Sequence, residues 1–133
     1  LQDIMGTHAG IVREKNELIQ GINKLDSIKS KIDTLKANPT SQYNPGWNLA
    51  IDLKNLHIVS TAVAKSALER EESRGGHTRL DFPDERSDLM DFNVVIKKDN
   101  DENMVVERKI KATPPDDLYS VAHSTLEKLE KNE

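Results

Sequence analysis

A run of apolar residues at helical spacing extends from Leu18 to Leu35. Its members are Leu18, Ile22, Leu25, Ile28, Ile32 and Leu35. Steps of three or four residues place all of them on one face of a single helix. A helix cannot bury such a face by itself, and each buried Leu or Ile contributes roughly 1.5–3 kcal/mol. The sequence therefore predicts a long helix that packs on other helices. We expect it to end at Asn38, because the residue before Pro39 is pushed out of helical geometry.

A second long helix is predicted to begin at Asn44, which supplies an N-cap, with Pro45 as the first helical residue. Its apolar positions again follow helical spacing: Leu49, Leu53, Leu56, Val59, Val63 and Ala67. Its alanine-rich second half permits the close approach of a neighbouring helix. We expect it to stop near Arg74, where Gly75-Gly76 supplies a left-handed C-cap. Apolar residues within positions 1–12 indicate a further, shorter helix upstream.

The pattern changes after Pro83. Two runs rich in β-branched residues, Phe92–Lys98 and Met104–Ile110, flank the polar stretch Asp99–Asn103. This arrangement predicts a β-hairpin with a turn of about five residues. The segment Thr113–Asp116 then reads as an N-cap, prolines and a first-turn acid. A short C-terminal helix should follow, with its apolar positions at Leu118, Ala122, Leu126 and Leu129.

The predicted fold is mainly α: a bundle of three helices, an appended β-hairpin and a short C-terminal helix. We expect one domain overall, with the bundle and its polar loop in residues 1–84 and the hairpin and tail in residues 85–133. The chain has 133 residues, which suffices for one domain with its own core. It begins with Leu1 and enters helical pattern directly, so we expect it to be a piece of a longer protein.

Composition excludes several classes of protein. The net charge is −4, with acids and bases interspersed, so we expect no nucleic-acid partner. The chain contains no cysteine, which excludes disulfides and thiolate metal sites. Its apolar runs are only a few residues long, so we expect neither a membrane span nor a signal peptide.

Polar chemistry concentrates between Glu69 and Pro83. The ionisable residues of this stretch are Glu69, Arg70, Glu71, Glu72, Arg74, His77, Arg79 and Asp81. Arginine forks favour bidentate contacts with carboxylates or phosphates. Three interpretations remain open from the residues alone: an anion site, a polar surface that docks on a neighbouring domain, or a helix end held by local ion pairs.

No other motif assembles a reaction centre. His8, His57 and His123 lack the spacing of a helical zinc site, and we expect each to be a surface or packing residue. Gly75-Gly76 lacks the pattern of a phosphate-binding loop, and Asp99–Asn103 lacks the glycine and the terminal glutamate of a calcium loop. We therefore predict no catalytic residue and no metal site in this chain.

The stretch Glu72–Arg79, followed by Asp81-Phe82-Pro83, resembles the pattern E-S-R-G-x-H-x-R-x-D-[FY]-P. That pattern marks the C-terminal domain of succinate dehydrogenase and fumarate reductase flavoproteins, with L-aspartate oxidase as a close relative. Supporting pieces stand in the family's order, namely the segment Gly10–Arg13, the motif Leu53-x-Asn55-Leu56, and Ala67-Leu68-x-Arg70 before the signature. The resemblance covers roughly residues 1–113, and the tail from Asp116 departs from the family's usual ending.

The resemblance implies a three-helix, spectrin-repeat-like bundle followed by a hairpin. Full-length members use FAD to move hydride equivalents between flavin and a C4 dicarboxylate, and their flavin and substrate motifs lie upstream. The resemblance thus implies FAD in the full-length protein, none bound to this chain, and no activity of this chain alone. The predicted docking loop consists of Arg70, Glu72, Arg74, Gly75, His77, Arg79 and Asp81.

Further expectations concern the complete protein. The implied partners are the flavin-binding and capping domains of the same polypeptide, and an iron-sulfur subunit of the parent complex. We expect a cytoplasmic protein, peripheral on the inner face of the cell membrane and without direct membrane insertion. The hairpin favours the dehydrogenase and reductase branch over L-aspartate oxidase. The alternative from another class is a free-standing helical interaction module that uses the Arg74–Arg79 stretch as its binding surface.

Overall fold

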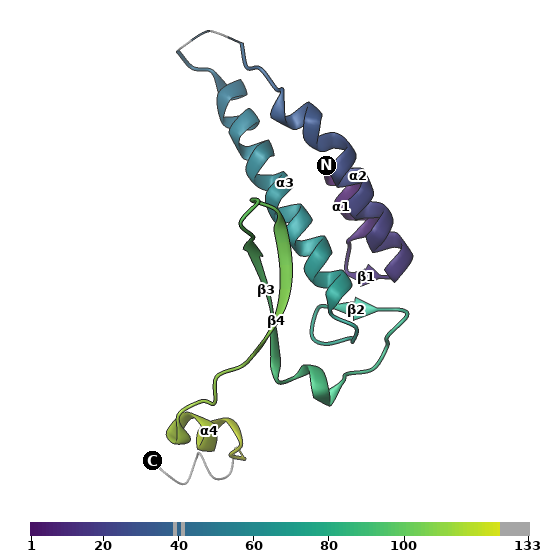
Figure 1. Ribbon diagram of the computed structural model, residues 1–133, viewed down its shortest axis with the longest axis vertical. Helices are drawn as coiled ribbons and strands as arrows, with labels where there is room; N and C mark the ends of the chain where they lie inside the picture. Colours follow the sequence, from purple (N-terminus) through teal and green to yellow (C-terminus); the bar gives the residue numbers. More distant parts are fainter. Residues whose placement is uncertain (39, 41, 126–133) are drawn as a thin grey trace.

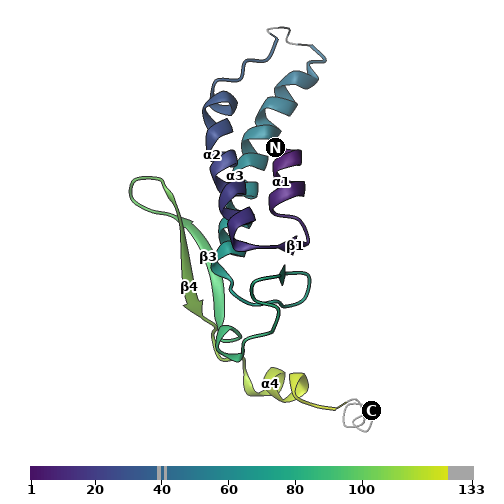
Figure 2. The same ribbon diagram turned by 90° about the vertical axis from the view of Figure 1, so that its right-hand side faces the viewer.

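The computed structural model describes residues 1–38, 40 and 42–125. Its elements are α1 (Gln2–His8), β1 (Val12–Arg13), α2 (Lys15–Asp33), α3 (Pro45–Glu69), β2 (Thr78–Arg79), the 3-10 turn η1 (Ser87–Leu89), β3 (Phe92–Lys98), β4 (Met104–Ile110) and α4 (Asp116–Ala122). The helices α2 and α3 run side by side in opposite directions, and α1 lies against α2 (Figures 1 and 2). The prediction of a mainly α fold with a hairpin is confirmed.

The apolar run on α2 forms the centre of the bundle, as predicted. Leu18 and Leu25 are fully buried, and Ile32 is 5% exposed. The helix nevertheless ends at Asp33 and not at Asn38. Thr34 ends it earlier, because its hydroxyl donates to the Ser30 carbonyl oxygen at 2.9 Å and so competes with continuation of the helix. Proline at position 39 therefore does not decide where α2 ends.

A close contact between two backbones seats α1 on α2. A Cβ atom added at Gly21 would lie 2.7 Å from the Cβ atom of His8, which real Cβ atoms do not tolerate. Gly21 is buried at this crossing, and His8 is 6% exposed. The Nζ atom of Lys24 donates to Nε2 of His8 at 2.8 Å. Glycine is needed here because only a residue without a side chain allows so short an approach.

The start of α3 follows the prediction. The helix begins at Pro45, and the Asn44 side chain accepts a hydrogen bond from the Gly46 amide at 3.0 Å. This bond satisfies one of the amides that a helix start leaves without a partner.

The buried face of α3 differs from the predicted one. Its buried residues are His57, Ser60, Thr61, Ala64 and Ala67. Most of the predicted apolar positions are exposed: Leu49 (66%), Leu56 (52%), Val59 (58%) and Val63 (40%). The small side chains let α3 approach α2 closely, while apolar residues on the rest of the circumference made helical spacing a poor guide to the buried side. His57 is a packing residue here, since its Nε2–H donates to the Leu25 carbonyl oxygen at 2.9 Å.

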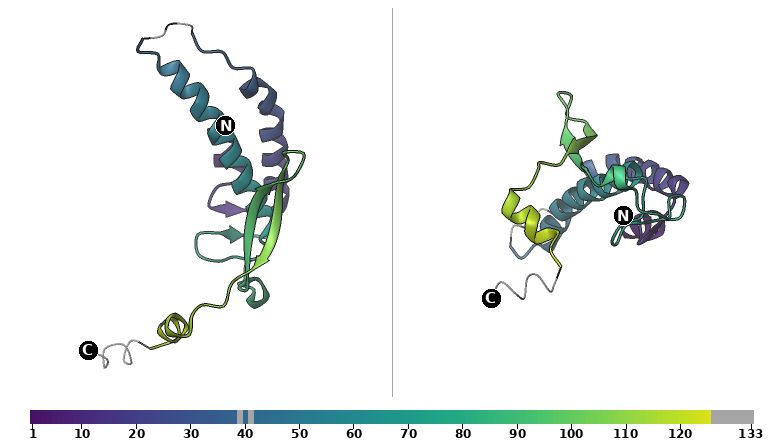
Figure 3. Two further views of the ribbon diagram at one scale, coloured as in Figure 1. Left: turned by 60° about the vertical axis from the view of Figure 1, so that its left-hand side comes forward. Right: turned by 90° about the horizontal axis from the view of Figure 1, so that it is seen from below.

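The β3–β4 hairpin has the predicted bounds and lies along α3 (Figures 1 and 3). Its antiparallel register runs from the pair Phe92–Ile110 to the pair Lys98–Met104. The Asp99 carboxylate closes the turn by accepting hydrogen bonds from the amides of Asp101 and Asn103. A polar turn of this kind fits the local bonding habit of aspartate.

The helix α4 lies beyond the hairpin and away from the bundle (Figures 1 and 3). It starts at Asp116 with Pro115 at the N-cap position, so the predicted N-cap at Thr113 was wrong. Leu118 is 58% exposed. The predicted positions Leu126 and Leu129 lie outside the described residues. Among the helices of the described part, none is long and apolar enough to cross a membrane.

Candidate functional site

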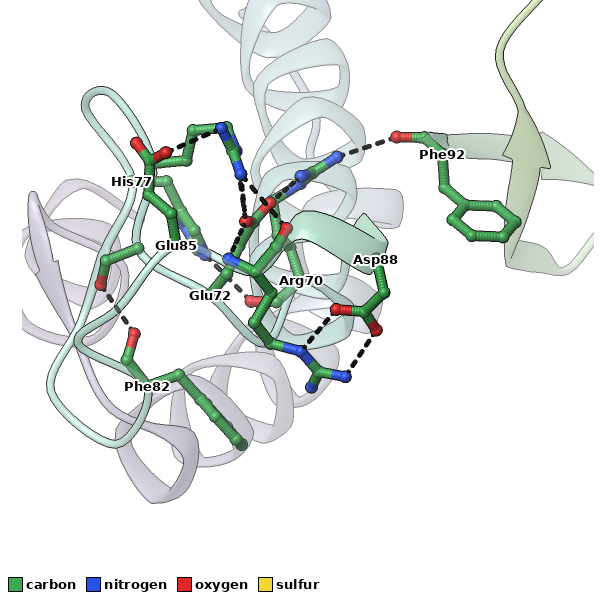
Figure 4. Close-up of polar contacts among 10 residues, drawn as sticks. Arg70, Glu72, His77, Phe82, Glu85, Asp88 and Phe92 are labelled. Atoms are coloured by element: carbon green, nitrogen blue, oxygen red, sulfur yellow. Dashed lines mark hydrogen bonds and ion pairs between the residues drawn. The ribbon is translucent and has the colours of Figure 1, made fainter. Parts of the chain in front are cut away.

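The polar loop, which we define as residues 70–88, joins the end of α3 to the hairpin. It contains all the residues predicted to dock: Arg70, Glu72, Arg74, Gly75, His77, Arg79 and Asp81. The structure brings their side chains together in one network of ion pairs and hydrogen bonds (Figure 4). Glu72 and Arg79 are fully buried, whereas Gly75 is exposed.

An arginine caps the C-terminus of α3. Arg79 is fully buried, and its Nη1 atom donates to three backbone carbonyls at the helix end, those of Ala67 (2.8 Å), Leu68 (3.2 Å) and Arg70 (3.2 Å). A cation at this end satisfies unpaired carbonyls and interacts favourably with the helix dipole. This cap ends the helix at Glu69, so the predicted end near Arg74 was wrong.

The two glycines serve a tight turn and not the helix cap. The backbone amide and carbonyl of Arg74 exchange hydrogen bonds with those of His77, at 2.8 and 3.0 Å. Gly75 lies inside this turn with a φ of +57°, a region that L side chains rarely adopt. The turn reverses the chain and returns it toward the end of α3.

Asp81 neutralises the buried Arg79 guanidinium. Its carboxylate accepts from Nε at 2.8 Å and from Nη2 at 2.6 Å, a bidentate geometry that fits the arginine fork. The hydrogen bond from Arg79 lowers the pKa of Asp81. The ring of Phe82 lies 5.0 Å from the same guanidinium carbon, within the range of a cation–π contact. Arg79 is therefore compensated on every side that the loop provides.

Glu72 is the second centre of the network. Its carboxylate accepts from the guanidinium of Arg70, from Nη2 of Arg74 at 3.0 Å and from the backbone amide of Arg86 at 3.0 Å (Figure 4). These donors, with Arg74 contributing most, lower the pKa of Glu72 from 4.5 to about 2 against the opposing effect of burial. Glu72 is thus an anion at any ordinary pH, and it joins the start of the loop to its end.

His77 connects the loop to the N-terminal segment. Its Nε2 atom lies 3.1 Å from the Arg70 carbonyl oxygen, which can only accept, so Nε2 carries the proton. Its Nδ1 atom then accepts from Nη1 of Arg13 at 2.7 Å. Burial lowers the pKa of His77, and the charges of Arg13, Arg79 and Arg70 lower it further. The ring is consequently a neutral bridge between two parts of the chain.

A short parallel pairing fixes the same junction. The strands β1 and β2 pair in the register Val12–Thr78 and Arg13–Arg79. The amide of Leu80 donates to the Arg13 carbonyl oxygen at 2.8 Å. The loop is therefore attached both to the end of α3 and to the segment that leads into α2.

Several residues of the site were not predicted from the sequence. Arg13 contacts His77, Glu85 accepts from Arg74 at 3.0 Å, and Ser73 accepts from the Arg79 amide at 2.8 Å. The one signal in the sequence was the position of Arg13 in the family segment Gly10–Arg13. Glu85 and Ser73 carry no sequence pattern that marks them as partners.

The site has the chemistry of a structural brace. Its charges are directed mainly at one another, and the described part of the chain contains no group of three or more His, Cys, Asp or Glu that could hold a metal ion. The sequence contains no glycine-rich dinucleotide loop, and the parallel pairing spans two residues in each strand. These residues do not fit FAD, and we assign no step of flavin chemistry to them.

The fold and this network define an accessory helical domain. A family profile described as "Fumarate reductase flavoprotein C-term" matches residues 1–125. The chain belongs to this family of flavoprotein C-terminal domains, which is a family of FAD-dependent oxidoreductases.

Known proteins agree with this family. The chain is 35% identical over 86 residues to a fumarate reductase (CoM/CoB) of Methanothermobacter marburgensis, a match that covers 65% of this chain and 16% of that protein. It is 36% identical over 89 residues to the succinate dehydrogenase flavoprotein of Coxiella burnetii, covering 66% of this chain and 15% of that protein. The L-aspartate oxidase of Pyrococcus abyssi is 37% identical over 83 residues, covering 62% of this chain and 13% of that protein.

Solved structures share the fold. One chain of the Mycobacterium smegmatis Sdh1 complex in its apo form superposes with a TM-score of 0.80 at 34% identity, over 98% of this chain and 22% of that one. Escherichia coli quinol fumarate reductase FrdA superposes with a TM-score of 0.72 at 27% identity, over 84% of this chain and 20% of that one. The chain thus spans about a fifth or less of the length of these relatives.

Proposed function

We propose that this chain packs against the flavin-binding and capping domains of its own polypeptide and holds them in register. In this role it contributes no catalytic group. The reaction of the complete protein would be the interconversion of succinate and fumarate, with FAD bound by residues upstream of this chain. The family match, to chains several times longer, favours this role over that of a free-standing interaction module.

The observation that carries the proposal is the exposed apolar surface of α3. Seven large apolar residues of this helix are 40–66% exposed: Trp47, Leu49, Ile51, Leu56, Ile58, Val59 and Val63. They lie around most of the circumference that α2 does not cover. A helix that is apolar all round is normally buried in its complete protein, and large exposed apolar patches mark interaction surfaces. The surface of α3 therefore calls for a covering partner.

The polar loop supplies the rigidity that such packing needs. The buried charges of Glu72 and Arg79 each have several partners within the chain. A loop held in this way keeps one shape, so little conformational entropy is lost when it docks. We propose that the less buried members of the network, Arg70, Arg74 and His77, form the part of the loop that faces the neighbouring domain.

Further proposals concern the complete protein. The hairpin favours the succinate dehydrogenase and fumarate reductase branch over L-aspartate oxidase. We propose that an additional partner is an iron-sulfur subunit. We also propose that the complete complex is cytoplasmic and peripheral on the inner face of the cell membrane.

The substitution Leu56→Gln tests the packing role. In the chain alone Leu56 is 52% exposed, so the substitution should change its unfolding midpoint little. In the full-length protein, the same substitution should lower the thermal midpoint and loosen the domain toward limited proteolysis, because an apolar contact is lost at an interface. Equal, small effects in both proteins would show that this side of α3 faces solvent and would contradict the proposal.

A second experiment tests the catalytic independence of the chain. The 133-residue chain is mixed with FAD and with succinate or fumarate. We expect no stoichiometric flavin binding and no turnover, whereas the full-length protein should show both. Tight binding of FAD by the chain alone would place the flavin site here and would refute the proposed role.

A further inference from the structure

A groove lies between α3 and the β3–β4 hairpin. Its volume is about 460 Å³. Aliphatic side chains form its walls: Ile58, Val59, Ala62 and Val63 from α3, with Val94, Ile96 and Met104 from the hairpin. Arg13, Arg70 and His77 also line it. The groove thus combines apolar walls with a group of hydrogen-bond donors that carries positive charge.

Arg13 differs from the other arginines in its lack of an anionic partner. Arg70, Arg74, Arg79, Arg86 and Arg108 each form an ion pair with a carboxylate. Within residues 1–38, 40 and 42–125, Arg13 forms no such pair. Its Nε atom donates to the Gly10 carbonyl oxygen at 2.7 Å, and its Nη1 atom contacts the neutral ring of His77.

This positive charge is held in an unfavourable place. Arg13 is partly buried, and burial, followed by the nearby charge of Arg79, lowers its pKa. The adjacent Arg70 and Arg79 are already paired with Glu72 and Asp81, so they cannot supply a counter-charge. The guanidinium has five N–H donors in a fixed fork, and the described contacts engage two of its nitrogens. A carboxylate is the group that such a fork pairs with best.

We propose that the groove receives a segment of the flavin-binding part of the same polypeptide, which places aliphatic side chains on its walls and an Asp or Glu carboxylate on Arg13. This inference rests on the proposed packing role and names the chemistry of the partner. The chain covers only 22% of the related Mycobacterium smegmatis chain, so most of such a polypeptide is at hand as a tethered occupant at high effective concentration. A small dicarboxylate fits less well, because its second carboxylate would meet aliphatic walls.

Carbodiimide cross-linking of the full-length protein tests the contact at Arg13. The substitution Arg13→Lys keeps the positive charge and introduces an amine that carbodiimide can join to a carboxylate in contact with it. We expect an amide link from position 13 to an Asp or Glu outside residues 1–133, identified by mass spectrometry. The matched control is Arg86→Lys, which should link to Asp88, its ion-pair partner at 2.7 Å.

Other outcomes would overturn the inference. These are a link from position 13 to a carboxylate within residues 1–133, a link between isotopically distinct copies, or no link while the control reacts. Suppression of the link by added succinate at a concentration that saturates only a free-ligand site would also overturn it, in favour of a small dicarboxylate.

Thiol labelling provides a second measurement that leaves Arg13 unchanged. The chain contains no cysteine, so Val59→Cys places a single thiol of this region on the groove wall, and Ser27→Cys places one on the exposed side of α2. In the full-length protein, a maleimide should label the groove thiol at about a tenth of the control rate or more slowly. Equal rates would show that the groove is open and would refute the inference.

The two proposals can fail separately. Leu56 does not line the groove, so its substitution reports on packing of α3 in general. If Leu56→Gln destabilises only the full-length protein while the groove thiol reacts freely, the domain packs through another face. In that case the packing role remains and the carboxylate contact at Arg13 is wrong.

Discussion

The substitution Glu72→Gln removes the charge at the centre of the polar loop with almost no change in shape. Glu72 is fully buried and accepts hydrogen bonds from two guanidinium groups and one backbone amide. Glutamine retains one carbonyl oxygen, but its NH2 group must face arginine donors. The variant therefore loses ion pairing and creates donor–donor contacts inside the protein.

The size of the effect follows from the pKa of Glu72. Folding lowers it from 4.5 to about 2, which corresponds to about 3 kcal/mol of stability at neutral pH, at about 1.4 kcal/mol per pH unit. Removal of one partner from a buried ion pair costs about 3–5 kcal/mol in other proteins, which agrees. We expect Glu72→Gln to lower the free energy of unfolding by about 3 kcal/mol and Tm by about 10 °C.

The assay is urea denaturation at neutral pH, followed by far-UV circular dichroism. The control is Asp88→Asn, the same carboxylate-to-amide change in the exposed pair with Arg86, where we expect little effect. The stability supplied by Glu72 should be complete above about pH 4.5 and should be lost as the pH falls toward 2, because the unfolded state then binds the proton first. Equal unfolding free energies for the two variants, or an undiminished acid-dependent loss in the Glu72→Gln variant, would refute this account of the network.

Two further predictions concern the bundle and its connection to the loop. Gly21→Ala should destabilise the chain by about 1–3 kcal/mol, measured by urea denaturation, because the new Cβ atom would lie 2.7 Å from that of His8. Gly6→Ala is the control: nothing lies within 4 Å of its Cβ position, so better helix propensity should leave stability unchanged or higher. For His77, whose folded pKa is lowered, stability should be full above the unfolded pKa of about 6.5 and fall as the pH drops below it. His77→Gln should flatten this part of the stability–pH profile, and an unchanged slope would contradict the neutral bridge to Arg13.

Local sequence signals located most of the secondary structure. The hairpin runs from Phe92 to Ile110 as predicted, and Asn44 caps α3 as predicted, because both depend on residues close together in the chain. The signature from Glu72 to Pro83 likewise identified the family that the profile over residues 1–125 shows. Short-range spacing, capping and a linear motif carry this information directly.

Tertiary structure alone decided the buried side of α3 and the geometry of the loop. Helical spacing could not choose among the apolar sides of α3, and the choice went to small residues such as Ala64, which let α2 approach closely. The end of the same helix was decided by Arg79, whose guanidinium reaches its last carbonyls from a later part of the chain. The contact between Arg13 and His77 likewise joins residues far apart in sequence. Such contacts depend on how the helices pack, and no pattern of neighbouring residues encodes them.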